Sequence, residues 1–393
     1  MSAYKYIDNG FFNKSISVLY TLCIIIVYYE LNSNYLAVSM LFSFTFIILF
    51  MMWGVSLSRY VTKNDKLVLI ISAIAFFITV LSALEYNESS FEYFKPFILF
   101  LCTLIYFSFI DKVRISNYVK KYILYLNLFL SIYVIYFFET HQTQVFEFNN
   151  IHVDYLVLNM DNPNKAALFL ACLFFNLSIF FFVIKRKFFR LLLFAIILMI
   201  VYMIYLTQAR NALFAIVLFT IVMLFHKRVN KIPQWGLKFI AIFPLLFAGV
   251  YMIFINIAID SGYFDFLISQ GKNLDSRMII WKEGFEGFFD YPILGAYYQI
   301  QKVYSYSSLH NTHLHILVAY GLIPFLLFVR FLYRILNYIN ITNAQLLQKA
   351  GIIAFVAIIF LGCGEASMIL GTQGIYILQG TVLLLTSSNR DIQ

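Results

Sequence analysis

Residues 188–226 read FFRLLLFAIILMIVYMIYLTQARNALFAIVLFTIVMLFH, two long apolar runs joined by the short turn Thr207-Gln208-Ala209-Arg210-Asn211. A helix that crosses a bilayer needs about 20 largely apolar residues. Each run approaches that length, and backbone groups in lipid must find their hydrogen bonds inside the segment, which favours helices. The stretch therefore predicts two consecutive transmembrane helices.

The same pattern extends along the whole chain, which is 62% hydrophobic and 12% charged with a mean hydropathy of +0.83. This composition excludes a soluble protein of this size. The fold class we predict is all-α: a polytopic helical membrane protein of about 12 transmembrane helices, with residues 1–393 forming one integral membrane domain. The candidate spans are 14–30, 34–53, 66–84, 94–110, 118–138, 164–184, 188–206, 208–226, 236–256, 311–330, 350–366 and 370–386.

The charges in the loops give an orientation. If the spans alternate, the side that holds both termini carries 21 of the 28 Lys and Arg residues but 4 of the 19 Asp and Glu residues. Positively charged short loops mark the cytoplasmic face, so we expect a multi-pass membrane protein with both termini in the cytoplasm. The net charge of +9 then results from the excess of basic residues in the cytoplasmic loops, and we expect no nucleic-acid partner.

The longest polar stretch, residues 257–310, becomes an external loop between the ninth and tenth spans. Within it, Ile280, Trp281 and Phe285 recur at roughly helical spacing, with charged residues between them. This pattern predicts an amphipathic helix on the membrane surface, capped by Asp275 or Ser276 and ended by Tyr291-Pro292. The loop 139–163 is a second, shorter and acidic external segment.

Two arginines on the external side are candidate anion ligands. Arg210 lies in the turn between the first two runs, and Arg277 lies in the first turn of the amphipathic helix, where free N–H groups also favour an anion. The planar guanidinium suits phosphate because it offers paired donors and stays charged. The alternatives are that Arg210 is an interfacial anchor and that the helix with Arg277 is a packing element.

Three histidines, His310, His313 and His315, stand at the start of the tenth span. They cannot converge on one metal from a regular helix, and no carboxylate has the spacing of a zinc site, so we predict no metal and no cofactor. His310, at the membrane–water boundary, suits a general base. The alternative is an interfacial histidine hydrogen-bonded to its neighbours, an interpretation that weighs more for the deeper His313 and His315.

Two permanent cations and one base on the external side fit a reaction in which a hydroxyl displaces a phosphate or pyrophosphate. No nucleotide is available outside the cell and the chain has no nucleotide-binding fingerprint. A lipid-borne donor is therefore expected.

The order of these motifs resembles the O-antigen ligase and O-antigen polymerase superfamily of bacterial glycan enzymes. The motifs are Ala209-Arg210-Asn211, Ser276-Arg277 with Trp281, Tyr291-Pro292-Ile293-Leu294-Gly295, and His310-Asn311-Thr312-His313-Leu314 with Gly321. The resemblance is concentrated in residues 205–330. The chain departs from the family pattern at Ala209, where a Ser or Thr is usual, and in having His313 within the last motif.

The resemblance implies a multi-pass glycosyltransferase of the bacterial inner membrane that uses undecaprenyl-pyrophosphate-linked saccharides as donor and acceptor and needs no metal. Arg210 and Arg277 would hold the pyrophosphate and His310 would activate the acceptor hydroxyl, with either histidine of the motif open as the base. We expect Asn311, His313, Trp281 and Ser276 to bind substrate. Membrane lipid and a chain-length regulator protein are the further partners expected.

Within the superfamily, short tails and the high Phe, Tyr and Ile content favour a polymerase of lipopolysaccharide biosynthesis. An O-antigen ligase, which transfers the glycan to the lipid A core, is the alternative. A glycan or anion transporter or flippase is an alternative of another class, but transporters place ionisable groups near the membrane midplane. The predicted spans are nearly free of such groups, with Glu365 as the main exception.

Overall fold

The structure, a computed structural model, describes about three fifths of the chain. The described residues are 63–86, 104, 116–140, 144–148, 151–158, 160, 162–226, 232–260, 275–293, 295, 309–339, 346–365, 368, 378–379, 381–382 and 385. The predicted spans 14–30 and 34–53 lie outside them, as do 94–110 and 370–386 apart from isolated residues.

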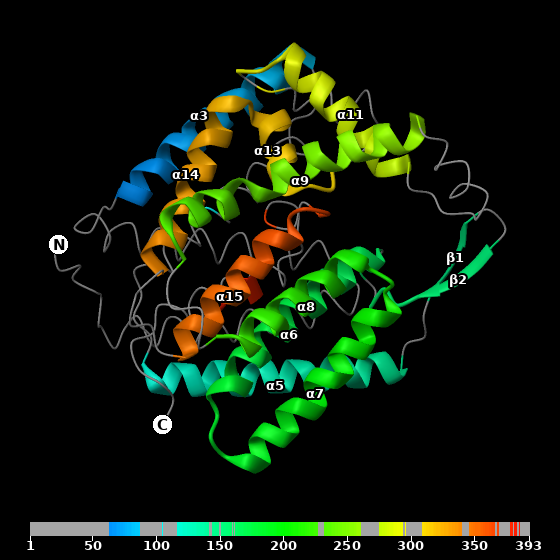
Figure 1. Cartoon of the computed structure of the whole chain (residues 1–393), viewed down its shortest axis with the longest axis vertical. Coiled ribbons are helices and arrows are strands. Elements are labelled where there is room, and N and C mark those ends of the chain that lie inside the picture. Colours follow the sequence, from blue (N-terminus) through cyan, green and yellow to red (C-terminus); the bar gives the residue numbers. More distant parts are fainter. Residues whose placement is uncertain are drawn as a thin grey trace.

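The described part of the chain is mainly helical (Figure 1). Its helices are α3 (Lys63–Tyr86), α5 (Asn117–Thr140), α6 (Pro163–Val183), α7 (Lys187–Leu206), α8 (Arg210–Leu224), α9 (Gln234–Asp260), α11 (Asp275–Asp290), α13 (Thr312–Tyr320), α14 (Leu322–Ile339) and α15 (Leu346–Leu361). Both runs of the opening stretch are helices, α7 and α8, as predicted.

By length and composition, four of the described helices can cross a membrane. These stretches are Tyr118–Phe138, Pro163–Val183, Lys187–Leu206 and Gln234–Phe254, and Lys66–Leu81, Arg210–Leu224 and Leu346–Leu361 are shorter apolar helices. The class predicted from composition, a helical membrane protein, is confirmed. The count of about twelve spans is not confirmed by the described residues.

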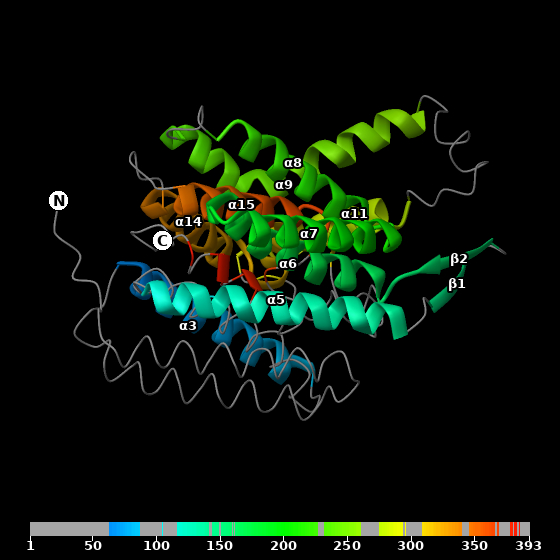
Figure 2. The same cartoon turned by 90° about the horizontal axis from the view of Figure 1, so that it is seen from below.

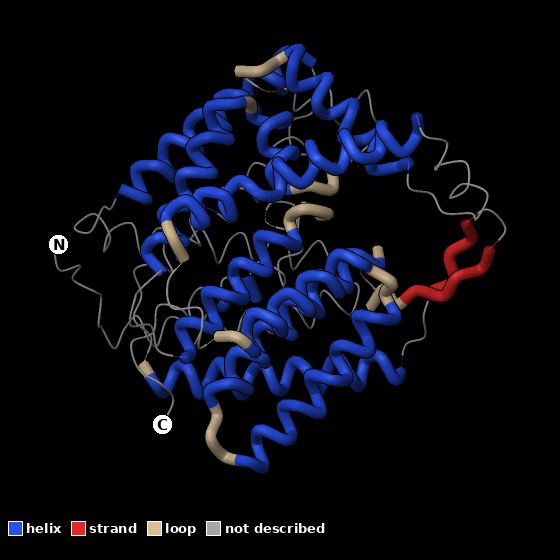
Figure 3. The backbone as a smooth tube through the Cα atoms, in the orientation of Figure 1, coloured by secondary structure: helices blue, strands red, loops and turns tan. Residues whose placement is uncertain are grey.

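One element departs from the all-helical prediction. Strands β1 (Gln144–Phe148) and β2 (Ile151–Tyr155) pair antiparallel, with Gln144 opposite Tyr155 and Phe148 opposite Ile151. This hairpin projects away from the helices (Figure 3, red). The hairpin lies in the segment 139–163 that was predicted as an external loop. This stretch has no helical pattern, and the antiparallel pairing of its two strands gives it a regular structure.

Helix α6 is the centre of one group of helices. Its buried residues run along nearly its whole length, and it lies between α5 and α8 with α15 beside it (Figures 1 and 2). Phe219 of α8 packs its ring against Phe174 and Phe175 of α6. Asn162 caps the start of α6 by accepting from the backbone N–H of Asn164 at 2.8 Å, followed by Pro163 in the first turn, a favourable beginning for a helix.

The predicted tenth span, 311–330, is two helices rather than one. Gly321 separates α13 from α14 with φ of 82° and ψ of 179°, a conformation that glycine alone adopts readily. The Tyr-Pro-x-x-Gly turn occupies the break: Leu322 N–H donates to the Pro292 carbonyl at 2.8 Å. A Cβ on Gly295 would lie 2.4 Å from the Ala319 carbonyl oxygen. The two glycine-containing motifs are therefore one backbone-to-backbone contact.

Helix α9 contains Pro244, which cannot donate to the helix ladder and so disturbs it. Two carbonyls in this part of α9 accept from α13 and its cap. The Pro244 carbonyl accepts from the Asn311 side chain at 2.8 Å, and the Ala241 carbonyl bonds His313 Nε2 at 2.7 Å. This contact fixes the start of α13 against α9.

Candidate functional site

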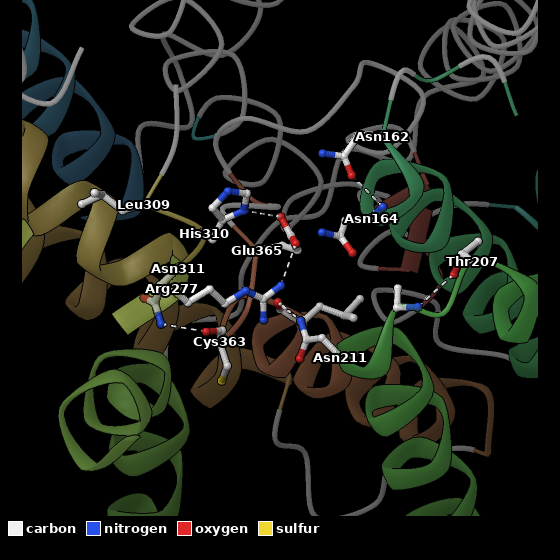
Figure 4. A network of polar contacts seen from close by, with 12 residues as sticks. Asn162, Asn164, Thr207, Asn211, Arg277, Leu309, His310, Asn311, Cys363 and Glu365 are labelled. Atoms are coloured by element: carbon white, nitrogen blue, oxygen red, sulfur yellow. Dashed lines mark hydrogen bonds and ion pairs between the residues drawn. The ribbon is translucent and has the colours of Figure 1, made fainter. Parts of the chain in front are cut away.

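Four helix ends meet at one place in the fold. The first turn of α8 meets the end of α15, because Asn211 Nδ2 donates to the Leu361 carbonyl at 2.7 Å. The start of α13 meets the same segment, because Thr312 N–H donates to the Gly362 carbonyl at 2.9 Å. The first turn of α11 reaches it through Arg277 (Figure 4). Segments far apart in the sequence thus form one polar site.

Residues of the sequence motifs form hydrogen bonds to the end of α15 and the segment after it, residues 361–365. Asn311 Nδ2 donates to the Cys363 carbonyl at 3.0 Å, and Thr312 Oγ1 donates to the Glu365 carbonyl at 3.0 Å. Together with the bonds to Leu361 and Gly362, these contacts give the carbonyls at and just after the end of α15 donors from the neighbouring helix starts. The position of Glu365 is therefore set by its backbone.

The Glu365 carboxylate joins the two leading residues of the loop that was predicted to be external. Arg277 Nη2 donates to Oε1 at 3.3 Å, and His310 Nδ1 lies 3.2 Å from Oε2 (Figure 4). The side chains of Arg277, His310 and Glu365 are 37%, 30% and 18% exposed. They are neither buried nor free in solvent, so a bound substrate can reach all three.

The backbone at His310 adopts an unusual conformation, with φ of 48°. A non-glycine residue in this region costs free energy and persists where the surrounding contacts determine it. Those contacts lie on both sides: Trp281 Nε1 donates to the Leu309 carbonyl at 2.7 Å, and Asn311 caps α13 by accepting from Leu314 N–H at 2.9 Å. The imidazole is thereby turned toward Glu365.

The other two histidines of the cluster are inside the protein. His313 has no exposed surface, its Nε2 bonds a backbone carbonyl, and its ring lies edge-on to Phe325 and Phe328 with centroids 6.1 and 5.5 Å away. His315 is 2% exposed. Between His310 and His313, only His310 combines access with a carboxylate partner.

Arg210 is the first residue of α8 and is exposed. No side chain caps this helix: Ala209 stands at the cap position, and the neighbouring Thr207 hydroxyl accepts from the Ala209 N–H at 3.3 Å. Gln208 just before it has φ of 55°. The departure from the family pattern at Ala209 therefore leaves the first N–H groups of α8 without a side-chain acceptor in this turn.

Gly364 connects the two arginine-bearing turns. A Cβ there would lie 3.0 Å from Asn211 Nδ2 and 3.1 Å from Arg277 Nη1, which is tight packing for a side chain. The absence of a side chain at this position lets the guanidinium of Arg277 approach the first turn of α8. Arg210, next to Asn211, thus lies on the same side of the bundle as Arg277.

Residues 194–329 match the family model described as O-antigen ligase. This segment is therefore similar to the O-antigen ligase family. It contains Arg210, Arg277 and His310 and confirms the resemblance drawn from the motifs. The match supports an enzyme of the O-antigen polymerase or ligase type, acting on lipid-linked polysaccharide in a membrane. No curated protein and no solved structure matches the chain.

The residues predicted to bind substrate have other contacts. Trp281 is buried, edge-on to Tyr251 at 5.3 Å between ring centroids, and supports Leu309. Asn311 is buried and uses both its amide and its carbonyl on the backbone. With His313 held against α9, all three have contacts typical of positioning residues. The side chain of Ser276 lies outside the described residues.

The predicted amphipathic helix is α11 (Asp275–Asp290), and its first residue is one of the two residues predicted to cap it. Ile280 and Trp281 are buried whereas Lys282 and Glu286 are exposed. Gly284 faces α13, since a Cβ on it would lie 3.2 Å from Leu309 Cδ1. The helix therefore packs its apolar side on the start of α13 and carries Arg277 at its first turn.

The residue that sequence reasoning did not place in the site is Glu365, which lies beyond the matched residues 194–329. The sequence carried a signal: a lone carboxylate in a predicted span is costly unless it is paired or functional. In the sequence analysis, Glu365 is the main exception to predicted spans that are nearly free of ionisable groups, the feature that argues against a transporter. The structure pairs it with both Arg277 and His310 instead.

Proposed function

We propose that the protein is a surface polysaccharide (O-antigen) polymerase, a glycosyltransferase that joins undecaprenyl-pyrophosphate-linked repeat units at the external face of the bacterial inner membrane. The observation that carries this proposal is the convergence of Arg277 and His310 on one carboxylate within 3.3 Å, beside the first turn of α8. A permanent cation and a base side by side suit transfer from a phosphorylated donor.

In this reaction Arg277 and Arg210 bind the pyrophosphate of the donor. In the described part of the chain, Glu365 is bound by a single guanidinium nitrogen of Arg277, so other donors of the guanidinium can reach phosphate oxygens. The N–H groups at the start of α8 favour the same anion. These groups stabilise the charge that grows on the leaving oxygen.

His310 acts on the acceptor sugar. Its Nε2 removes the proton of the attacking hydroxyl, and the hydroxyl oxygen forms a bond to the anomeric carbon of the donor. The bond from that carbon to the pyrophosphate oxygen breaks, and its electron pair leaves with undecaprenyl pyrophosphate. All atoms of the donor and acceptor appear in the lengthened glycan, the lipid pyrophosphate and the proton on His310.

The external location rests on the loop charges, 21 of 28 basic residues on the side of the termini, and both termini would be cytoplasmic. The described helix ends support a common side for the site: the ends of α7 and α15 and the starts of α8 and α13 come together around it. A chain-length regulator protein is a further partner we propose, to be tested by co-purification.

The decisive experiment gives the purified protein, in detergent, one lipid-linked repeat unit as both donor and acceptor. A polymerase yields a ladder of lengthened lipid-linked glycans and releases undecaprenyl pyrophosphate. If glycan appears only on added lipid A core, the protein is a ligase instead. If no product forms with either acceptor, but vesicles carrying the protein move the glycan lipid, the enzyme proposal is wrong and a transporter is supported.

A further inference from the structure

Glu365 carries an inference that neither the family match nor the motifs supply, because it lies outside residues 194–329. We propose that Glu365 is a positioning residue for His310: its carboxylate fixes the imidazole in the Nδ1–H tautomer, so that Nε2 is free to accept the proton of the acceptor hydroxyl. This inference rests on the proposed polymerase function.

The tautomer follows from the chemistry of the pair. An ionised carboxylate only accepts hydrogen bonds, so the 3.2 Å contact between His310 Nδ1 and Glu365 Oε2 requires the proton on Nδ1. The lone pair of the neutral ring is then on Nε2. A carboxylate that orients a histidine in this way also stabilises the imidazolium that forms once the ring takes up a proton.

Hydrogen bonds from the residues next to His310 fix the backbone position of Glu365. Thr312 and Asn311, the two residues that follow His310, hold the Glu365 and Cys363 carbonyls at 3.0 Å each. The ring and its partner are thus fixed to each other by the same turn. Such a shared frame is what a positioning residue needs, because small displacements weaken proton transfer.

The second oxygen of the Glu365 carboxylate, Oε1, also has a partner. Arg277 binds Oε1, so the two oxygens of Glu365 serve two different residues. His315 on α13 is an ionisable neighbour that interacts with His310 electrostatically. Helix α9 presents the Ala241 and Pro244 carbonyls to His313 and Asn311. When the donor occupies Arg277, Glu365 keeps its bond to His310.

The test compares wild-type protein with Glu365→Gln and Glu365→Asp in lipid nanodiscs. A neutral amide can donate to Nδ1 as well as accept from it, so Glu365→Gln no longer selects one tautomer. Nitrogen-15 histidine spectra at pH 8, with the His310 signal assigned from its loss in His310→Gln, should show the Nδ1–H form in wild-type protein and a mixture in Glu365→Gln.

In the chain-extension assay, Glu365→Gln should lower kcat by about 10²-fold while the donor KM changes less than about threefold. Glu365→Asp should restore part of kcat because it restores the charge. Glu286→Gln, a neutralisation of an exposed carboxylate on α11, is the matched control and should behave as wild type in both measurements.

An unchanged tautomer in Glu365→Gln overturns the proposal, whatever the activity. A loss of kcat equal in Glu365→Gln and Glu365→Asp, with the tautomer preserved in both, also overturns it, because that pattern marks a structural role only. If wild-type protein lengthens no glycan but the tautomer changes as expected, the polymerase proposal fails and the role of Glu365 in fixing His310 stands.

Discussion

His310 and His313 are three residues apart in one motif, yet they lie in two different kinds of environment. His310 is partly exposed and faces a carboxylate, whereas His313 is fully buried between a backbone carbonyl of α9 and two phenylalanine rings. We call the first region the Glu365 network (Arg277, His310 and Glu365) and the second the α9 contact (Ala241, Pro244, Asn311 and His313).

The difference shows how one short motif can do two jobs. The α9 contact fixes the helix start with hydrogen bonds to two backbone carbonyls of α9, those of Ala241 and Pro244. The Glu365 network uses that fixed start to hold a strained His310 beside Arg277. Changes in the network should therefore affect activity more than folding, and changes in the packing around the contact should do the reverse.

A large effect on activity is expected for Arg277→Ala. Loss of a charge-assisted group aimed at the leaving pyrophosphate should lower chain extension by about 10³-fold, with little change in the yield of folded protein. Arg277→Lys should recover little, because the paired donors are lost. Arg210→Ala should also reduce activity. Near-normal extension by Arg277→Ala would remove the network from the mechanism.

The largest effect on folding is expected for Gly321→Ala. Its backbone conformation costs a non-glycine residue about 1–3 kcal/mol, and the new Cβ would lie 2.1 Å from the Ile293 carbonyl oxygen. Yield and melting temperature should fall clearly. Gly249→Ala in α9, where a Cβ meets nothing within 4 Å, is the control. Equal stability of the two variants would show that the helix break does not depend on Gly321.

A smaller effect is expected for Gly364→Ala, which tests the network without touching its charges. The added Cβ pushes Arg277 or Asn211 by a few tenths of an ångström, so extension should fall by about tenfold while the melting temperature stays close to that of wild type. Gly287→Ala, with its nearest contact 4.0 Å away at Val318, should leave the rate unchanged. A rate for Gly364→Ala equal to that of the control would place Arg277 outside the reaction.

Much of this arrangement could be predicted from the sequence because its signals are local. The apolar runs predicted α5 to α9, the polar excursion predicted α11, and the order of the motifs predicted the family. The break at Gly321 also had a local signal, a glycine followed by Pro324. It went unrecognised because the apolar run continues through it.

The pairing of Glu365 with His310 had no local signal, because the two residues are 55 positions apart. A period of 3.6 residues shows which side of a helix is apolar, but not which neighbour it meets. For the same reason Trp281 was expected at the substrate, and only the packing of α11 on α13 shows its indole bonded to Leu309.

The most direct test of the account makes the same substitution in both regions. His310→Gln and His313→Gln are purified in parallel, and chain extension is measured per amount of folded protein. The account predicts a loss of about 10²–10⁴-fold for His310→Gln with an unchanged melting temperature, and a lower melting temperature with retained specific activity for His313→Gln. The reverse pattern would contradict it and make His313 the base.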